Sequence, residues 1–295
     1  MMFDYRKIIR NQELRLDIVN WLKFIPSVPY LKLVYRIKTG RKLNLKNPVG
    51  FNEKLNWLKL HDKHPEYTDL ADKYKVREII KEKLGDGYSI PLLGVWDRFE
   101  DIDFAQLPDR FVLKCSHDSG SVRIIKDKSE LDEKKLEELR VFYTKHLKRN
   151  PYNSGREYPY RKIRPRILAE QYMEVPGGIN DYKFFCFDGE PKLMFVATDR
   201  STDCRFDFFD MEFNHLDIYN IHPNSDRVVS KPVLFEEMKR VAEKLSQGIK
   251  HVRIDLYEIN GQIYVGEYTF FHGGGFWLFE PEEWECRLGD WIDIS

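Results

Sequence analysis

The sequence lacks the features that mark several classes of protein. Its four cysteines form no CxxC pair and stand at no zinc-finger spacing to histidine, so we expect reduced, mostly buried thiols. No apolar run approaches the about 18 residues that a membrane span needs, and the N-terminus lacks the continuous apolar core of a signal peptide. These absences predict a cytoplasmic protein.

A net charge is also absent, because 48 Lys and Arg balance 48 Asp and Glu. The balance argues against a nucleic-acid partner, but the charge is unevenly distributed. Residues 1–50 hold 11 basic and 3 acidic residues, a net charge of +8, so the remainder carries −8. With 295 residues, of which 42% are hydrophobic, the chain can bury one large core or two lobes.

The basic N-terminal segment is expected to form two short helices, residues 6–25 and 29–40, broken at Pro26 and Pro29. An apolar stripe surrounded by basic residues is typical of a helix that lies on an anionic membrane. Such stripes more often face protein, so a helical cap on the core is the favoured alternative. The membrane interpretation would place the protein at the inner face of the membrane.

Familiar catalytic signatures are missing as well. No GKS or GKT opens a helix, which excludes a P-loop, and no Ser-His-Asp or Cys-His spacing indicates a protein nucleophile. A small-residue loop, SHDSGS at 116–121, nevertheless joins two predicted strands, and Lys114 precedes it. Such a loop lets backbone N–H groups approach a phosphate. A plain hairpin turn is an equally good interpretation of the loop alone.

Apolar periodicity predicts the remaining elements. Helices are expected at 51–60, at 66–84, at about 131–147 with Ser129 as its cap, and at 233–249. Strands are expected at 89–96, 111–115, 122–125, 167–173, 181–187 and 191–200.

A basic loop, residues 148–166, separates two of these elements. Seven Lys and Arg face one Glu there, with three tyrosines interleaved. Such a loop could grip single-stranded nucleic acid by stacking and phosphate contact, or close over an anionic small substrate. The neutral total charge favours the small substrate.

Residues 251–275 predict a hairpin that runs into a glycine-rich loop. Asn260-Gly261 suits a type I′ turn. Alternation is expected to group the polar side chains on one face: Arg253, Asp255 and Tyr257 on the first strand, and Val265, Glu267 and Thr269 on the second. If Asp255 and Glu267 face the same way, two carboxylates and an arginine form a constellation suited to Mg²⁺ and polyphosphate. An ordinary solvated hairpin has about equal support.

The order of these parts resembles the ATP-grasp enzymes, and more closely the TupA-like (teichuronopeptide-biosynthesis) ATP-grasp amidoligases. The resemblance covers about residues 48–280. It rests on FNEKLNWLKL, DLADKYKVR, FVLKCSHDSGS, REYPYRKIRPRILAEQY and VGEYTFFHGGG. It implies an α+β ATP-grasp fold in which two α+β lobes enclose the nucleotide, with an N-terminal helical segment. The expected domains are a basic segment 1–50, an N-terminal lobe 51–110, a nucleotide-loop lobe 111–173 and a metal-binding and catalytic lobe 174–295.

The resemblance also implies roles for individual residues. Those expected to bind ATP are Lys114, Ser119, Gly120, Glu170, Gln171 and Tyr172. Lys183, Arg253 and Arg200 are the expected catalytic residues, and Asp255, Glu267 and Thr269 the expected Mg²⁺ ligands. Thr269 stands where these enzymes commonly have Asn, and a hydroxyl is a weaker Mg²⁺ ligand than an amide carbonyl. The expected substrate residues are Arg161, Lys162, Arg164, His272, Gly273 and Gly274.

The implied activity is ATP-dependent amide formation through an acyl phosphate. Its partners would be an amine or amino acid and a carboxylate-bearing saccharide, such as a uronic-acid-containing precursor of a capsular or cell-surface polysaccharide. Two alternatives remain open. A nucleotide-sugar glycosyltransferase would use a DxD motif, and Asp101-Ile102-Asp103 has that form. A non-catalytic module would bind a polyanion through the basic loop.

Overall fold

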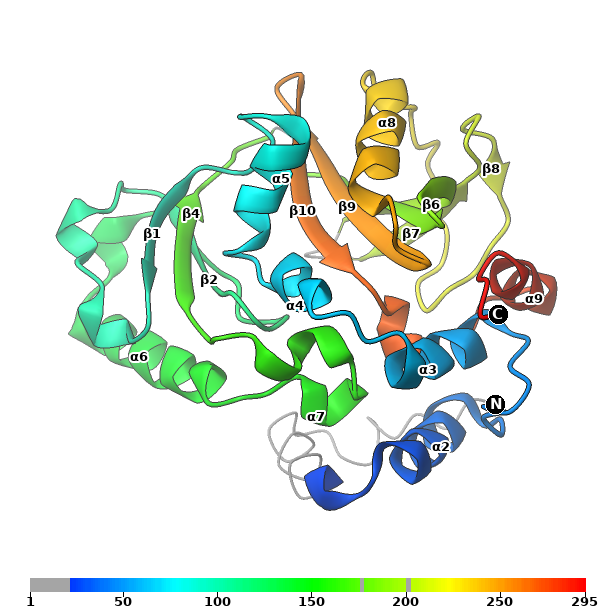
Figure 1. Cartoon of the computed structure of the whole chain (residues 1–295). Helices are drawn as coiled ribbons and strands as arrows, with labels where there is room; N and C mark the ends of the chain where they lie inside the picture. The colour runs from blue at the N-terminus through cyan, green and yellow to red at the C-terminus, as the bar shows by residue number, and fades with distance from the viewer. Residues whose placement is uncertain (1–21, 176–177, 200–202) are drawn as a thin grey trace. The chain divides into compact units, whose positions relative to one another are not determined.

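The computed structural model describes residues 22–175, 178–199 and 203–295, and the chain divides into two compact units. The first unit takes its described residues from 1–64, 152–158 and 179–295, and the second takes them from 65–151 and 159–178. The chain therefore leaves and re-enters the first unit twice (Figure 1).

The first unit is built on a six-stranded antiparallel sheet in the order β10-β9-β5-β6-β7-β8. Its strands are β5 (Asp181–Phe187), β6 (Glu190–Thr198), β7 (Arg205–Phe209), β8 (His215–Leu216), β9 (His251–Ile259) and β10 (Gln262–Thr269). Its helices are α2 (Ser27–Thr39), α3 (Phe51–His61), α7 (Tyr152–Gly155), α8 (Phe235–Ser246) and α9 (Glu282–Asp290).

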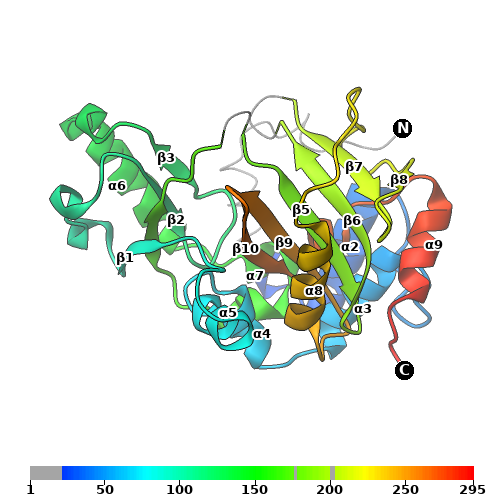
Figure 2. The ribbon, with the colours of Figure 1, turned by 90° about the horizontal axis from the view of Figure 1, so that it is seen from above.

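Helix α8 covers the apolar face of this sheet. It packs across β5, β6 and β9 (Figure 2). Its buried residues include Met238 and Leu245. Phe184 and Ile254 are fully buried and are register partners on β5 and β9, with Phe184 near the α8 residue Phe235. Side chains alternate along a strand, so the residues between them point to the opposite face, where the charged side chains gather.

Helix α2 has one buried face and one exposed face. Tyr30, Leu31 and Tyr35 pack with Leu43 and Phe276 in a hydrophobic cluster, as a helical cap requires. The predicted helix at 6–25 lies outside the described residues except at its end. Among the residues that the structure describes, no helix is long and apolar enough to cross a membrane.

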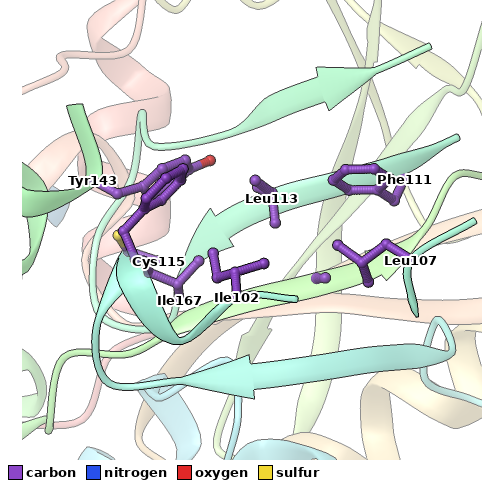
Figure 3. Close-up of a cluster of buried hydrophobic side chains, with 9 residues drawn as sticks. Ile102, Leu107, Phe111, Leu113, Cys115, Tyr143 and Ile167 are labelled. Atoms are coloured by element: carbon purple, nitrogen blue, oxygen red, sulfur yellow. The ribbon is translucent and has the colours of Figure 1, made fainter. Parts of the chain in front are cut away.

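The second unit is built on a four-stranded antiparallel sheet in the order β1-β4-β2-β3, accompanied by α-helices. The strands are β1 (Leu92–Trp96), β2 (Phe111–Cys115), β3 (Arg123–Ile125) and β4 (Ile167–Gln171), and the helices are α4 (Glu66–Ala71), α5 (Val76–Leu84) and α6 (Glu133–Leu147). Figure 3 shows its core, in which Phe111, Leu113, Tyr143 and Ile167 are fully buried.

The prediction of a single helix at 66–84 is wrong, because the helix is interrupted between α4 and α5. The side chain of Asp72 accepts a hydrogen bond of 2.9 Å from the backbone N–H of Tyr74, and the N–H of Lys73 bonds to the carbonyl of Ser116. An Asp side chain that captures a nearby N–H competes with helix propagation. Helical periodicity continues across the break, which explains the error.

The predicted cap at Ser129 is also wrong. Helix α6 begins at Glu133, and Asp132 caps it by accepting a 2.7 Å hydrogen bond from the N–H of Lys135. Ser129 instead donates to Asp127 within the preceding 3₁₀ turn, Lys128–Glu130.

Candidate functional site

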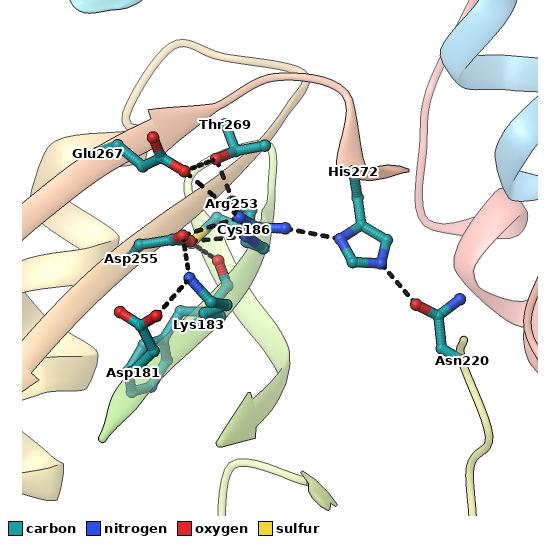
Figure 4. Close-up of polar contacts among 10 residues, drawn as sticks. Asp181, Lys183, Cys186, Asn220, Arg253, Asp255, Glu267, Thr269 and His272 are labelled. Atoms are coloured by element: carbon teal, nitrogen blue, oxygen red, sulfur yellow. Dashed lines mark hydrogen bonds and ion pairs between the residues drawn. The ribbon is translucent and has the colours of Figure 1, made fainter. Parts of the chain in front are cut away.

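The charged face of the first unit carries a row of side chains across three adjacent strands. Asp255 on β9 is the register partner of Glu267 on β10 and of Lys183 on β5. The two carboxylates therefore share a face, as the metal-site interpretation of the hairpin requires. Figure 4 shows these side chains converging.

A β-bulge in β10 produces this convergence. Asn260 and Gly261 both have positive φ, 53° and 73°, as a two-residue type I′ turn requires. In the register set by that turn, Val265 pairs with Leu256. The preceding residue of β9, Asp255, pairs with Glu267 rather than with Gly266, because Gly266 is an extra residue in β10. The expectation that Val265 shares a face with Glu267 is therefore wrong.

Asp255 is the centre of a buried ionic cluster. Its side chain is 1% exposed and accepts two hydrogen bonds from Arg253, of 2.6 and 2.7 Å, and one from Lys183. Burial alone would raise the pKa of this carboxyl, but Arg253 and Lys183 outweigh it and hold the pKa below its usual value. The Lys183 ammonium also lies 3.3 Å from Asp181.

Glu267 differs from Asp255 in its exposure. Its side chain is 37% exposed, and the Arg253 guanidinium lies 3.8 Å away. The Thr269 hydroxyl donates to it over 3.2 Å and accepts a 3.1 Å hydrogen bond from Arg253. Thr269 thus links the expected metal carboxylate to the expected catalytic arginine.

The donor set at this face fits Mg²⁺, which prefers carboxylate oxygens and fills its remaining positions with water and phosphate. Asp255 and Glu267 offer such oxygens on paired positions, and Lys183 and Arg253 offer positive charge beside them. In the described part of the chain, no group of three or more His, Cys, Asp or Glu could hold a metal ion by itself. A magnesium ion here would take its remaining ligands from water and phosphate.

His272 is fully buried and contacts Arg253. Its Nδ1 lies 2.6 Å from the Arg253 Nη1, and its Nε2 lies 2.8 Å from the Asn220 Oδ1. Burial, and then the charge of Arg253, hold its pKa well below the usual value. Both ring nitrogens of His272 therefore have partners within the protein, and its expected contact with substrate stays a prediction.

The glycine turn that follows, Gly273–Gly275, is clamped by helix α3. All three glycines have positive φ, from 57° to 70°. Lys59 donates to the carbonyl of Gly274 over 2.5 Å, Asn56 to that of Gly275 over 2.7 Å and Asn52 to that of Trp277 over 2.8 Å. These three α3 side chains, spaced at i, i+4 and i+7, were not predicted, although that spacing on one helix face is visible in FNEKLNWLKL.

Lys59 is 1% exposed and also lies over the ring of Phe276 at 4.4 Å. Burial lowers its pKa to about 7, although Glu157 opposes the shift. It is therefore a buried lysine that contacts the turn expected to meet the substrate.

The second unit holds the expected nucleotide residues. The Lys114 Nζ lies 2.6 Å from one carboxylate oxygen of Glu170, and Arg77 bonds to the other over 3.2 Å. The backbone N–H of Gln171 donates to the carbonyl of Pro91, and Arg110 lies over the ring of Tyr172 at 5.6 Å. Lys114 and Glu170 thus form one cluster on neighbouring strands.

The loop 116–121 has buried ends and an exposed tip. Ser121 donates to Asp118, accepts a 2.8 Å hydrogen bond from the N–H of Cys115, and is buried together with Asp118. Ser119 and Gly120 form the exposed tip, where Gly120 has φ 93°. A fixed base with an accessible backbone tip suits phosphate contact.

The expected substrate cations of the basic loop are exposed. Arg161 and Lys162 end the 3₁₀ helix η6 (Tyr158–Lys162), and Arg164 forms an exposed 2.5 Å ion pair with Asp97. Arg200, the third expected catalytic residue, lies outside the described residues.

Comparisons with known proteins place this geometry in context. A family model described as TupA-like ATPgrasp matches residues 53–293. D-alanine–D-alanine ligase from Bacillus anthracis, solved with ATP, has 18% identity and a TM-score of 0.40 over 68% of this chain and 53% of that chain. L-amino acid ligase from Bacillus licheniformis has 16% identity and a TM-score of 0.45 over 91% of this chain and 57% of that one. The chain thus spans little more than half the length of these two proteins, and no curated protein matches it.

Proposed function

The chain belongs to the TupA-like ATP-grasp family, and from this membership we propose that it is an ATP-dependent carboxylate–amine ligase that uses ATP and Mg²⁺. The membership confirms the predicted family, the α+β ATP-grasp fold class and the assignment to the ATP-dependent ligases. The observation that carries the proposed reaction is the row Glu267, Asp255 and Lys183 with Arg253 beside it.

In the proposed reaction a carboxylate oxygen of one substrate attacks the γ-phosphorus of ATP, and ADP leaves. The amine nitrogen of the second substrate then displaces phosphate from the acyl phosphate and loses a proton, which leaves an amide. Bound Mg²⁺ would supply positive charge to the phosphate oxygens. No protein nucleophile is needed, in agreement with the absence of such a motif.

Each group of residues has a proposed part in this chemistry. Asp255 and Glu267 would hold Mg²⁺, while Lys183 and Arg253 would neutralise the charge that moves during phosphoryl transfer. Lys114 of the second unit would contact the nucleotide phosphates, with Glu170 keeping its ammonium in place.

The proposed substrates are an amine or amino acid and a carboxylate-bearing saccharide of cell-surface polysaccharide synthesis. The resemblance to the amidoligases of such pathways supports this choice. The exposed cations Arg161, Lys162 and Arg164 support an anionic acceptor.

The test is nucleotide release from the purified protein with Mg-ATP, an amino acid and a uronic acid. We expect ADP release that needs all components, and Lys114→Ala should weaken binding of a non-hydrolysable ATP analogue. Release of UDP from a nucleotide sugar instead would favour the glycosyltransferase. Release of neither nucleotide, together with polyanion binding, would favour the binding module.

We also propose that the N-terminal segment contacts an anionic membrane surface from the outer face of α2. Val28, Leu33 and Ile37 are exposed there beside Lys32 and Arg36, and residues 22–50 contain seven basic and no acidic residues. Sedimentation with anionic vesicles at low salt should capture the protein, and Leu33→Glu with Ile37→Glu should release it. The matched control is Val228→Glu with Val233→Glu, which changes two exposed valines elsewhere on the unit. No binding at low salt would leave α2 as a cap alone.

A further inference from the structure

Arg253, His272 and Asn220 form a chain of hydrogen bonds, and only one placement of the imidazole proton of His272 satisfies that chain. A guanidinium can only donate, so the Nδ1 of His272 must accept from Arg253 over 2.6 Å. The ring proton is then on Nε2, which donates to the Asn220 Oδ1 over 2.8 Å. The Asn220 amide nitrogen in turn donates to the carbonyls of Trp277 and Leu278, over 3.3 and 3.1 Å. This chain fixes the neutral Nε2–H tautomer of His272.

The surroundings of the imidazole support the same tautomer. The ring is fully buried and lies among aromatic side chains, with ring centroids at 5.0 Å from Phe185, 5.4 Å from Trp277 and 5.7 Å from Phe279. The nearby groups that influence its charge are the cations Arg253 and Lys183 and the buried His251. An imidazolium here would point an N–H at the guanidinium of Arg253 in a buried, mostly aromatic environment, so it is strongly disfavoured.

Arg253 has a different partner on each side of its guanidinium. Its Nε and Nη2 bond to Asp255, its Nη2 also bonds to Thr269, and its Nη1 bonds to His272. Asp255 and Thr269 are both expected to meet magnesium, so their geometry should change when the nucleotide binds. His272 instead contacts Nη1, the nitrogen that does not bond to Asp255 or Thr269. His272 is not one of the expected magnesium ligands.

We propose that His272 is a positioning residue, which holds Arg253 in its productive orientation through a neutral imidazole and does not touch substrate. The inference rests on the proposed function, because the orientation matters only if Arg253 serves phosphoryl transfer. Residues that orient a ligand from behind typically change activity about ten- to a hundredfold when they are replaced.

Two substitutions separate the two hydrogen bonds of the ring. His272→Asn places an amide oxygen near the Nδ1 position and can still accept from Arg253. His272→Gln places its amide near the Nε2 position and can reach Asn220 but not Arg253. We expect His272→Asn to retain kcat within about threefold, and His272→Gln to lose about ten- to a hundredfold in kcat with little change in KM for ATP. His215→Asn and His215→Gln, at an exposed histidine of β8, are matched controls.

The reverse ranking, or equal losses in both variants with normal unfolding midpoints, would overturn the proposal, as would a change confined to the KM of the acceptor. A readout independent of turnover is the Nη1–H signal of Arg253 in ¹H–¹⁵N spectra, assigned with Arg253→Lys, because Nη1 is the nitrogen that bonds to His272. It should be kept in His272→Asn and displaced in His272→Gln. If the wild type releases no ADP but this signal behaves as expected, the proposed function fails while the positioning of Arg253 stands.

A measurement on the wild type covers the case in which a variant does not fold. The ¹⁵N shifts of the His272 ring should show the neutral Nε2–H tautomer and stay constant between pH 8 and about 5.5. A neutral Nδ1–H form or an imidazolium in that range would contradict the proposal.

Discussion

The two expected magnesium carboxylates should respond very differently to the loss of their charge. Asp255→Asn removes a carboxylate that bonds to both Lys183 and Arg253, whose side chains are each 9% exposed. Removing one partner of a buried ion pair costs about 3–5 kcal/mol, because the remaining charge stays buried without compensation. Glu267→Gln removes a 37% exposed carboxylate that lies 3.8 Å from the Arg253 guanidinium, so the cost should be about 0–1 kcal/mol.

Turnover should nevertheless fall in both variants. Each substitution removes a charge from the expected metal site, and losing one group that stabilises transition-state charge costs about 10²–10³ in kcat. Glu267→Gln should therefore be a folded, inactive protein, whereas Asp255→Asn should be both inactive and destabilised.

The assay pairs urea unfolding, followed by circular dichroism, with ADP release. Glu190→Gln is the matched control, since Glu190 is an exposed carboxylate of the same sheet with a lysine 3.2 Å away. Normal turnover in Glu267→Gln would refute the role of the hairpin in metal binding. Equal unfolding free energies in the two variants would refute the account of Asp255 as the centre of the buried cluster.

Three further predictions concern the basic loop, the buried His251 and the bulge in β10. Replacing Arg161, Lys162 and Arg164 together by Ala should raise the KM for the acceptor with little change in Tm, because exposed ion pairs contribute weakly; a large loss of Tm with normal kinetics would contradict this. Burial holds the pKa of His251 at about 3, so the unfolded chain binds the extra proton between that value and about 6.5, and stability should fall by about 2 kcal/mol from this residue as the pH drops from 6.5 to 5; an unchanged urea midpoint over that range would argue against a buried neutral His251. Deleting Gly266 should keep Glu267 opposite Asp255 and preserve Mg²⁺-dependent ADP release, because the pairs on either side of the bulge are already in register; inactive but folded protein would show that the bulge itself shapes the site.

In the β9–β10 hairpin, the sequence predicted the turn and the face of the first strand, but not the register of the second strand. Asn260-Gly261 predicted the turn, and alternation placed Arg253 and Asp255 on one face. The same alternation, counted strictly from the turn, puts Glu267 on the face of Ile254. Only the bulge at Gly266 brings the two carboxylates together, and a glycine inside a strand indicates a bulge without fixing its register.

Other differences arose where tertiary hydrogen bonds override local pattern. Helical periodicity runs through 66–84, but the backbone of Lys73 is bonded to Ser116, which is distant in sequence. The Nε2 of His272 likewise contacts Asn220, which comes from a distant segment with no recognisable motif. Contacts between distant segments leave no periodic signal, so these contacts became visible only in the folded chain.

The clamp between helix α3 and the glycine turn ties two distant segments into one unit of local stability. Lys59, Asn56 and Asn52 each bond to a different carbonyl of the segment 274–277, so opening the turn breaks three hydrogen bonds of buried side chains at once. Native-state amide hydrogen exchange should therefore detect 273–277 and the C-terminal half of α3 opening together, with one common free energy. A turn so rich in glycine would then exchange as slowly as the helix that holds it.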